Sequence, residues 1–211
     1  TNHIKGNDMA KVLVIKSSIF SKQGESSKLV DHSIAALEQQ FGKVDIIERD
    51  FAIDPIAHLS GETMASFSTE DISDLSVEQR ESLKLSNDLI SELKSADYII
   101  LGVPMYNFGI PSTLKAWIDN IARAGLTFKY TETGPVGLVD NVKKVMIMAA
   151  RGGIYQGTPK DNQTNYLVDV LGFMGICNIE FVYAEALNMG EKDAEIEQAK
   201  LHIERIVSAL D

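Results

Sequence analysis

Short apolar runs alternate along the chain with longer segments of helical periodicity, and this alternation restricts the possible folds more than any other feature. The run Tyr98–Val103 is continuously apolar, which indicates a strand buried on both faces. Regular alternation of strand and helix predicts a parallel sheet covered by helices on both faces. Because crossovers are right-handed, few arrangements remain, and five strands suit the order 2-1-3-4-5. We therefore expect an α/β protein with a doubly wound five-stranded parallel sheet.

The positions of the elements follow from the apolar runs and from apolar residues at helical spacing. Strands are predicted at Lys11–Lys16, Val44–Ile47, Tyr98–Val103, Val142–Ala149 and Ile179–Ala184. Helices are predicted over Leu29–Phe41, Val77–Ala96, Pro111–Ile121, Gln163–Met174 and Asp193–Leu210. Gly42 is interpreted as a helix C-cap, and Ser76 with Gln79 as a capping box. The segment Phe51–Leu75 is expected to be an irregular functional loop or lid.

Length and charge restrict the class of protein. With 211 residues, of which 45% are hydrophobic, the chain suits a single domain, expected over residues 9–211. Thr1–Asp8 is interpreted as an expression-tag remnant and Met9 as the natural start. A formal net charge of -10 argues against nucleic-acid binding, and no apolar run has the length of a membrane span. Because Cys177 is the only cysteine, no internal disulfide can form, and a cytoplasmic location is expected.

Three loops are expected at one edge of the sheet, because doubly wound sheets bind ligands beyond the carboxyl ends of their strands. They are Ser17–Ser27, Pro104–Gly109 and Ala150–Gly157. The first is rich in serine and leads into a helix, whose free N–H groups and positive dipole end suit a phosphate. It matches neither Walker A nor G-x-G-x-x-G, which argues against a Rossmann dinucleotide site. Taken alone, it fits equally well a loop in which Ser26 only caps the helix.

The other two loops carry aromatic residues and glycines. Pro104–Pro111 places Tyr106 and Phe108 directly after a buried strand, where a flat conjugated ligand would give them a packing partner. The alternative is a hydrophobic turn under the next helix. Gly152 and Gly153 would let backbone N–H groups approach a ligand, although a plain strand-to-helix turn fits this segment as well. Together, the three loops predict a site for a planar ligand that carries a phosphate, as FMN does.

Several motifs, in order along the chain, resemble those of the bacterial FMN-dependent NADH-azoreductases. They are K-V-L-V-I-K-S-S at 11–18, G-E-S at 24–26, P-M-Y-N-F at 104–108, A-R-A-G at 122–125, T-F-K-Y-T-E at 127–132 and R-G-G at 151–153. The resemblance extends from about residue 10 to residue 207. It implies a flavodoxin-like homodimer with one FMN per subunit at the subunit interface. It also implies that NADH reduces quinones and azo compounds through the flavin.

The resemblance further implies roles for particular residues. Those expected to hold the FMN phosphate are Ser18, Gly24, Glu25 and Ser26. Those expected to pack around the isoalloxazine and ribityl groups are Met105, Tyr106, Asn107 and Phe108. Those expected to line the polar edge of the flavin are Ala150, Arg151, Gly152 and Gly153, with the Arg151 charge favouring an anionic ring. Those that resemble residues of the acceptor pocket are Tyr130 and Phe173.

Two residues depart from the pattern of that family. Ala150 stands where a serine is common before Arg-Gly-Gly, so a hydroxyl contact is lost. Glu25 lies in the phosphate loop, where its carboxylate would repel a phosphate, and we expect it to contribute its backbone N–H. No side chain is expected to act as a nucleophile or metal ligand, because the cofactor carries the chemistry. Since both substrates would stack on one flavin face, ping-pong kinetics are expected.

Three other functions are compatible with a flavodoxin-like sequence. An electron-carrier flavodoxin would need a redox partner and would not oxidise NADH directly. A flavodoxin-like module without flavin would serve regulation or protein interaction. Chains of this family have also been labelled acyl-carrier-protein phosphodiesterases, but no cluster of His and carboxylates at metal-ligand spacing supports such a hydrolysis.

Overall fold

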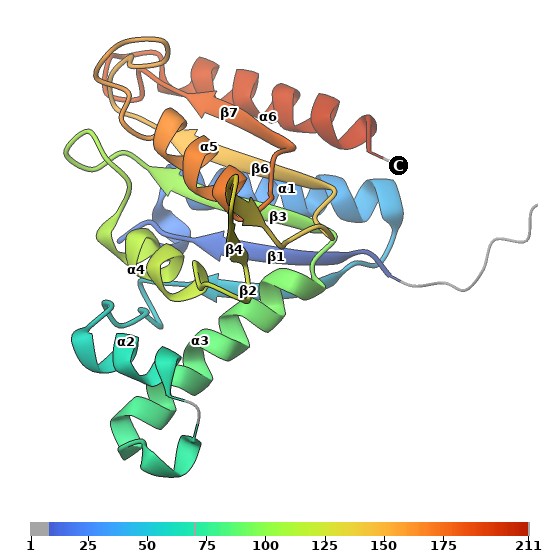
Figure 1. Ribbon diagram of the computed structural model, residues 1–211. Coiled ribbons are helices and arrows are strands. Elements are labelled where there is room, and N and C mark those ends of the chain that lie inside the picture. The colour runs from blue at the N-terminus through green and yellow to red at the C-terminus, as the bar shows by residue number, and fades with distance from the viewer. Residues whose placement is uncertain (1–8, 70, 211) are drawn as a thin grey trace, which may run out of the picture.

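The fold is built on one parallel sheet (Figure 1). The computed structural model describes residues 9–69 and 71–210, so the segment interpreted as a tag remnant, 1–8, lies outside the described residues. The strands of the sheet are β1 (Lys11–Lys16), β2 (Asp45–Asp50), β3 (Tyr98–Pro104), β6 (Lys144–Ala150) and β7 (Ile179–Ala184). They lie in the order β2-β1-β3-β6-β7, and every neighbouring pair is parallel. Counted within the sheet, this is the order 2-1-3-4-5, which confirms the predicted fold class.

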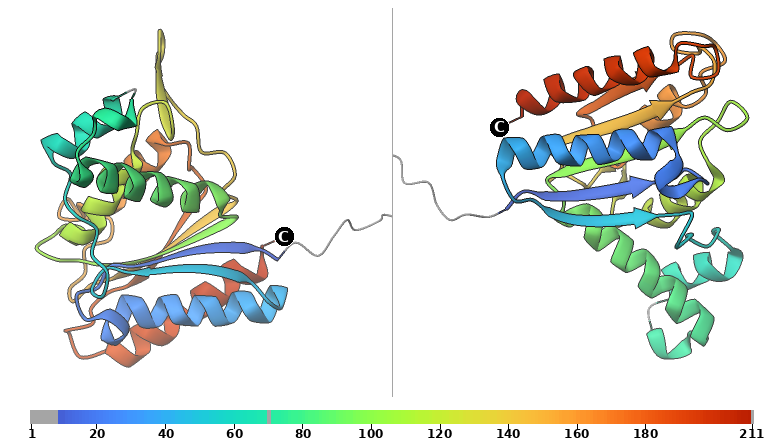
Figure 2. Two further views of the ribbon diagram at one scale, coloured as in Figure 1. Left: turned by 90° about the horizontal axis from the view of Figure 1, so that it is seen from below. Right: turned by 180° about the vertical axis from the view of Figure 1, so that it is seen from behind.

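Helices cover both faces of the sheet (Figure 2). One face is covered by α1 (Glu25–Phe41) and α6 (Lys192–Ser208). The other is covered by α3 (Val77–Ser95), α4 (Ser112–Ile121) and α5 (Thr164–Phe173). Successive strand residues point to opposite faces, so Val14 packs under α1 and α6, whereas Ile15 packs under α3 and α4. The apolar runs of the sequence therefore supply two cores, one on each side of the sheet.

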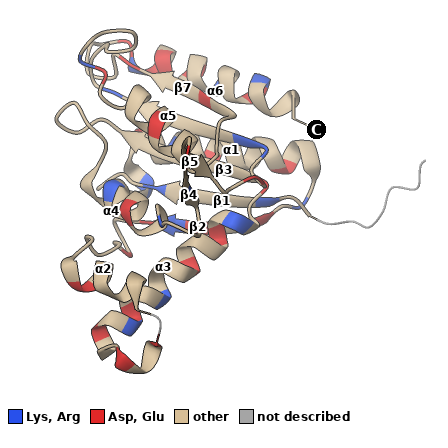
Figure 3. Cartoon of the chain, viewed as in Figure 1, with Lys and Arg blue, Asp and Glu red and all other residues tan. Residues whose placement is uncertain are grey.

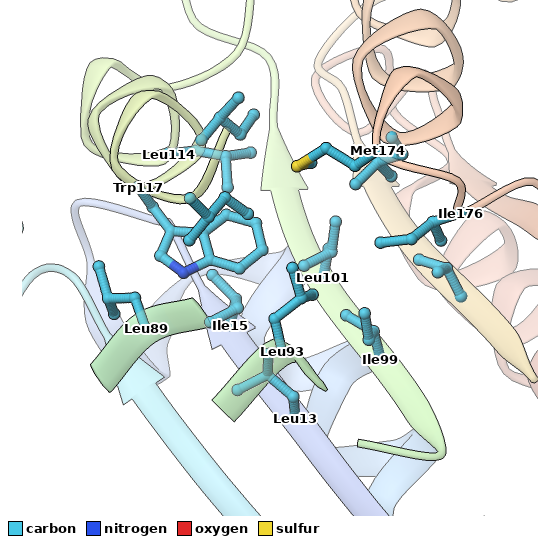
Figure 4. Close-up of a cluster of buried hydrophobic side chains, with 14 of the residues drawn as sticks. Leu13, Ile15, Leu89, Leu93, Ile99, Leu101, Leu114, Trp117, Met174 and Ile176 are labelled. Atoms are coloured by element: carbon cyan, nitrogen blue, oxygen red, sulfur yellow. The ribbon is translucent and has the colours of Figure 1, made fainter. Parts of the chain in front are cut away.

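The core under α3, α4 and α5 is centred on Trp117 (Figure 4). Trp117 of α4 is fully buried and lies beside Leu89 of α3 and Ile15 of β1. Burial of large side chains such as these stabilises the fold by about 1.5–3 kcal/mol each. The rigid sheet that results holds the loops at its carboxyl edge in fixed positions.

Most element predictions are confirmed within a few residues. Gly42 ends α1 with φ +77°, a backbone angle that glycine adopts without strain. The capping box is also present, because Ser76 Oγ accepts from Gln79 N at 3.2 Å and Gln79 Oε1 accepts from Ser76 N at 3.0 Å. Strand β2 extends to Asp50, beyond the predicted end at Ile47.

The prediction that Phe51–Leu75 is irregular throughout was wrong. This segment contains α2 (Gly61–Ser68) and a short 3-10 helix, Ile72–Asp74. Gly61 and several Ser and Thr residues are poor helix formers, which concealed α2 in the sequence. Its stability comes from a cap, Ser60 Oγ accepting from Thr63 N at 3.1 Å, and from packing beside α3.

A β-hairpin was also missed. It consists of β4 (Phe128–Thr131) and β5 (Gly134–Gly137), and it projects from the body of the protein (Figure 2). Glycine and proline in β5 conceal its strand character. The hairpin is anchored where Gly137 meets Gly175, since a Cβ on Gly137 would lie only 2.1 Å from the Gly175 nitrogen.

Charged residues of both signs are interspersed on the outer helices, as α3 shows in Figure 3. The same pattern continues in α6, which carries both Lys192 and Glu195. Within the described residues, no helix is both long enough and apolar enough to span a bilayer. In the same residues, no group of three or more His, Cys, Asp and Glu side chains is arranged to hold a metal ion.

Candidate flavin site

The three loops predicted to form the site follow β1, β3 and β6 and lie at one edge of the sheet (Figure 1). Direct hydrogen bonds connect them. Tyr106 Oη, in the second loop, accepts from Ile19 N in the first loop at 3.1 Å. Met105 N, in the second loop, donates to Ala150 O at the start of the third loop at 3.1 Å. The loops therefore form one continuous surface.

Within residues 9–69 and 71–210, the start of α1 offers several polar groups that lack hydrogen-bond partners. Gly24 is the N-cap and supplies no capping side chain, so the N–H groups of Glu25, Ser26 and Ser27 have no hydrogen-bond acceptor in the described part of the chain. The Ser26 and Ser27 hydroxyls are buried and, within the same residues, also have no hydrogen-bond partner. Each such buried hydroxyl costs roughly 1–3 kcal/mol. An anion with several oxygens at this helix start would satisfy both hydroxyls and the N–H groups.

Ser18 and Gly24 fit tightly together beside this helix start. A Cβ on Gly24 would lie 2.2 Å from Ser18 Oγ, so only glycine fits here without displacing the serine. Ser18 is itself buried, and its Oγ accepts from Phe20 N at 3.2 Å. The loop thus keeps a hydroxyl and a bare backbone close to the predicted phosphate position.

The Glu25 carboxylate is engaged by lysines. Its Oε1 lies 2.7 Å from Lys192 Nζ and 3.0 Å from Lys28 Nζ. Burial opposes ionisation of Glu25, but hydrogen bonds from Lys192 and Lys28 outweigh it and hold the pKa of this carboxyl below its ordinary value. Because two ammonium groups more than offset its single charge, Glu25 repels a neighbouring phosphate less than an unpaired carboxylate would.

The second loop contains a strained two-residue turn. Tyr106 and Gly109 exchange two backbone hydrogen bonds of 3.0 Å, and the residues between them, Asn107 and Phe108, have φ of +51° and +66°. Two positive φ angles define a type I′ turn, in which glycine is usual at the second position. Phenylalanine there costs on the order of 1–3 kcal/mol in backbone strain. This turn conformation places the half-exposed ring of Phe108 at the edge of the sheet, with its centroid 5.8 Å from that of Tyr155.

The third loop presents backbone N–H groups. Among the described residues, the N–H groups of Gly152 and Gly153 donate to no other group, although both carbonyls accept bonds from the segment after β7. A Cβ on Gly152 would lie 2.4 Å from Asn188 Nδ2, so a side chain does not fit there. These free donors can therefore bind the polar edge of a planar ring.

The guanidinium of Arg151 is fully buried and is held by carboxylates. Nη1 and Nη2 each lie 2.9 Å from a carboxylate oxygen of Asp161, and Nη1 lies 3.3 Å from Glu185 Oε2. Burial opposes ionisation of Asp161, but its hydrogen bonds with Arg151 prevail and hold the pKa of Asp161 below its ordinary value. Since the carboxylates of Asp161 and Glu185 more than offset its charge, the Arg151 side chain does not offer a free cation to an anionic ring. The Arg151 backbone is engaged as well, because its N–H donates to Ala184 O at 2.8 Å and its carbonyl accepts from Leu187 N at 3.2 Å.

Tyr130 and Phe173 are brought together by the hairpin. The ring of Phe128 in β4 lies 4.2 Å from that of Phe173 in α5 and 5.4 Å from that of Tyr130. Tyr130 is 74% exposed, so its ring is available to a ligand or a second chain. In the described residues, the ring of Phe128 contacts those of Tyr130 and Phe173. None of these three rings contacts an aromatic ring of the three loops.

Three residues of the site region were not predicted from the sequence. Ser27 directly follows Ser26 at a helix start, and this pairing was a usable signal. Glu185 accepts from the backbone N–H of Tyr155 at 2.6 Å, and Gln163 contacts Arg151. Neither lies in a recognisable motif, because their roles depend on contacts between segments that are distant in the sequence.

Comparison with known proteins identifies the family of this chain. A family model described as "Flavodoxin-like fold" matches residues 10–207. The chain belongs to this flavodoxin-like family. An FMN-dependent NADH:quinone oxidoreductase of Cellvibrio japonicus is 49% identical over 201 residues, which cover 95% of this chain and 100% of that protein. A protein of the same name from Alcanivorax borkumensis is 51% identical over 180 residues, which cover 85% of this chain and 90% of that protein.

Solved structures of azoreductases share this architecture. An azoreductase from Bacillus anthracis str. Sterne superposes with a TM-score of 0.87 at 26% identity, covering 96% of this chain and 100% of that one. An FMN-dependent NADH-azoreductase from Bacillus anthracis str. Ames Ancestor, solved in complex with FMN, gives a TM-score of 0.86 at 25% identity. That match covers 95% of this chain and 98% of the other.

Proposed function

We propose that this chain binds FMN and transfers reducing equivalents from NADH to quinones and azo compounds. The observation that supports the proposal is the start of α1. There, two buried hydroxyls and three backbone N–H groups have no hydrogen-bond partner among the described residues, and they lie beside a turn with a half-exposed aromatic ring. A phosphate next to a stacking surface matches FMN. The names of relatives at 49% and 51% identity, both FMN-dependent NADH:quinone oxidoreductases, supply the reductant and the acceptor class.

Each part of FMN has candidate residues in this chain. Ser18, Gly24 and Ser26, with the N–H of Glu25 and the hydroxyl of Ser27, would hold the phosphate. Residues 105–108 would pack along the ribityl chain and the ring. The N–H groups of Gly152 and Gly153 would donate to the polar edge of the ring, where a reduced flavin carries negative charge.

When bound, FMN would supply a ring that accepts one hydride, which carries two electrons, from NADH and passes both electrons to an acceptor. The protein orients this ring, provides the free backbone donors and shapes the space above the ring. Tyr130 and Phe173 would line that space for flat acceptors. Because NADH and acceptor would use the same space in turn, the proposal includes ping-pong kinetics.

The proposal includes a homodimer in the cytoplasm. Several large apolar side chains near the sheet edge are exposed, among them Ile19 at 62% and Ile154 at 61%, and Tyr130 on the hairpin is 74% exposed. A second copy of the chain would cover them and complete the wall of the site. Sedimentation equilibrium of the purified protein tests this, since a monomer at micromolar concentration contradicts the dimer. Fractionation of cells that express the chain tests its location.

The direct test mixes the FMN-loaded protein with NADH and a quinone in the absence of any other protein. Consumption of NADH with parallel double-reciprocal plots is the expected result. No consumption would favour the electron-carrier alternative, and intersecting plots would contradict the shared binding face. The same assay with NADPH in place of NADH tests the preferred nucleotide.

A further inference from the structure

The side chain of Gln163, just before α5, lies buried between two of the loops. Its Nε2 donates to Pro104 O at 2.9 Å and to Gly109 O at 3.0 Å. Its Oε1 accepts from Arg151 Nε at 3.1 Å. Both amide hydrogens and the amide oxygen are therefore engaged, although Gln163 is 59 residues from Pro104 and 54 from Gly109 in the sequence.

The two carbonyls that Gln163 binds stand at the two ends of segment 104–109, which contains the strained turn. Pro104 is the last residue of β3, and Gly109 closes the turn through its paired hydrogen bonds with Tyr106. Between them lie Asn107 and Phe108, both with positive φ. Such backbone strain persists only where the surroundings hold the chain in place. The amide of Gln163 clamps the turn from outside, in addition to the hydrogen bonds of the turn itself.

Arg151 fixes the direction in which this amide points. An arginine N–H only donates and a backbone carbonyl only accepts, so a flipped amide would place two donors against each other and an oxygen against two carbonyl oxygens. Arg151 is in turn held by Asp161 and Glu185, and Glu185 also accepts from Tyr155 N at 2.6 Å. A single buried network thus connects the loop after β6 to the turn after β3.

We propose that Gln163 is a positioning residue, whose amide, oriented by Arg151, holds the 104–109 turn in the conformation that binds the flavin ring. This inference rests on the proposed function. Gln163 acts through the turn, and it thereby sets the affinity for FMN and the KM for the acceptor.

The test compares Gln163→Met and Gln163→Glu with the wild-type protein. Met retains the length of the side chain but loses every hydrogen bond. Glu still accepts from Arg151, which preserves the buried contact, but its carboxylate cannot donate to the Pro104 and Gly109 carbonyls. Both variants are expected to bind FMN roughly 10-fold or more weakly, measured by quenching of flavin fluorescence, and to show a raised KM for a quinone.

Asn141→Leu is the matched control. The Asn141 amide also bridges two backbone carbonyls, those of Leu93 at 3.1 Å and Ala96 at 2.7 Å, but it does so at the opposite end of the sheet. This variant is expected to lower the Tm of the apoprotein as the Gln163 variants do, while its FMN dissociation constant stays within about twofold of wild type. An equal loss of FMN affinity in the control would show that general destabilisation is responsible and would overturn the proposal.

A double-mutant cycle separates clamping of the turn from other effects. Phe108→Gly gives the turn the Asn-Gly pair that type I′ turns favour, so that it needs less support. The effect of Gln163→Met on the FMN dissociation constant is therefore expected to be several-fold smaller in the Phe108→Gly background. Independent effects, or FMN binding by both Gln163 variants that equals wild type, would overturn the inference. If the wild-type protein itself fails to bind FMN, the proposed function fails instead.

Discussion

The start of α1 and the surroundings of Arg151 are both buried, polar and adjacent to the same sheet edge, but they differ in hydrogen bonding. Around Arg151, the guanidinium meets Asp161, Glu185 and Gln163. At the start of α1, the hydroxyls of Ser26 and Ser27 meet no partner in the described part of the chain. A satisfied buried network stabilises and orients its neighbours, whereas unsatisfied donors are prepared for a ligand. The contrast separates residues that support the site from residues that bind.

The largest expected effect comes from breaking the satisfied region. Arg151→Met leaves Asp161 and Glu185 buried without their cation and is expected to lower the free energy of unfolding by about 3–5 kcal/mol. Urea denaturation of the apoprotein measures this loss. Lys84→Met is the control, because the Lys84 pair with Asp88 is solvent-exposed and worth about 1 kcal/mol or less. Equal losses in the two variants would contradict the assigned supporting role.

The second prediction concerns the unsatisfied region. Ser27→Ala removes a buried hydroxyl that has no hydrogen-bond partner among the described residues, so the apoprotein is expected to keep its stability or gain up to about 1 kcal/mol. FMN affinity is expected to fall about tenfold or more, because a charge-assisted hydrogen bond is lost.

Ser33→Ala, in the same helix, is the control for this prediction. Ser33 Oγ donates to Val30 O at 2.8 Å, so its loss is expected to destabilise the fold by about 1 kcal/mol without changing FMN affinity. If Ser27→Ala destabilised the apoprotein as Ser33→Ala does, the two hydroxyls would not differ as the structure indicates.

Acid should weaken the satisfied region selectively. Folding lowers the pKa of Asp161, so its ionised form stabilises the native state above the ordinary pKa of an aspartate, and that stability disappears as the pH falls below about 4. The Tm of the apoprotein is expected to fall more steeply from about pH 5 to about pH 3 in the wild type than in Asp161→Asn. Identical slopes would mean that Asp161 contributes nothing to the acid sensitivity.

The smallest effect is expected at the turn that the supporting region clamps. Phe108→Gly relieves a positive φ and is expected to raise the stability of the apoprotein by up to about 1 kcal/mol. Thermal unfolding measures the change. A clear loss of stability would show that the packing of Phe108 on Tyr155 outweighs the strain.

The sequence predicted the sheet order and the loops at its edge because both depend on local patterns. Periodicity located the strands, whereas the serine-rich loop before α1 fitted equally well an anion site and a loop in which Ser26 only caps the helix. The role of the Arg151 side chain was not predictable, since a guanidinium beside two glycines indicates a ligand contact until Asp161 and Glu185 are placed around it. Gln163 carried no signal at all, because its partners lie 54 and 59 residues away. The β4–β5 hairpin was not predicted because the glycines and the proline of β5 are typical of loops.

We propose that the start of α1 binds the phosphate of FMN. Titration of the apoprotein with FMN and with riboflavin, which has the same ring but no phosphate, tests it most directly. The expected result is that FMN binds at least about 100-fold more tightly, as two or more charge-assisted hydrogen bonds require. The double variant Ser26→Ala, Ser27→Ala is expected to lose most of this difference. Equal affinity of the wild-type protein for FMN and riboflavin would contradict the claim.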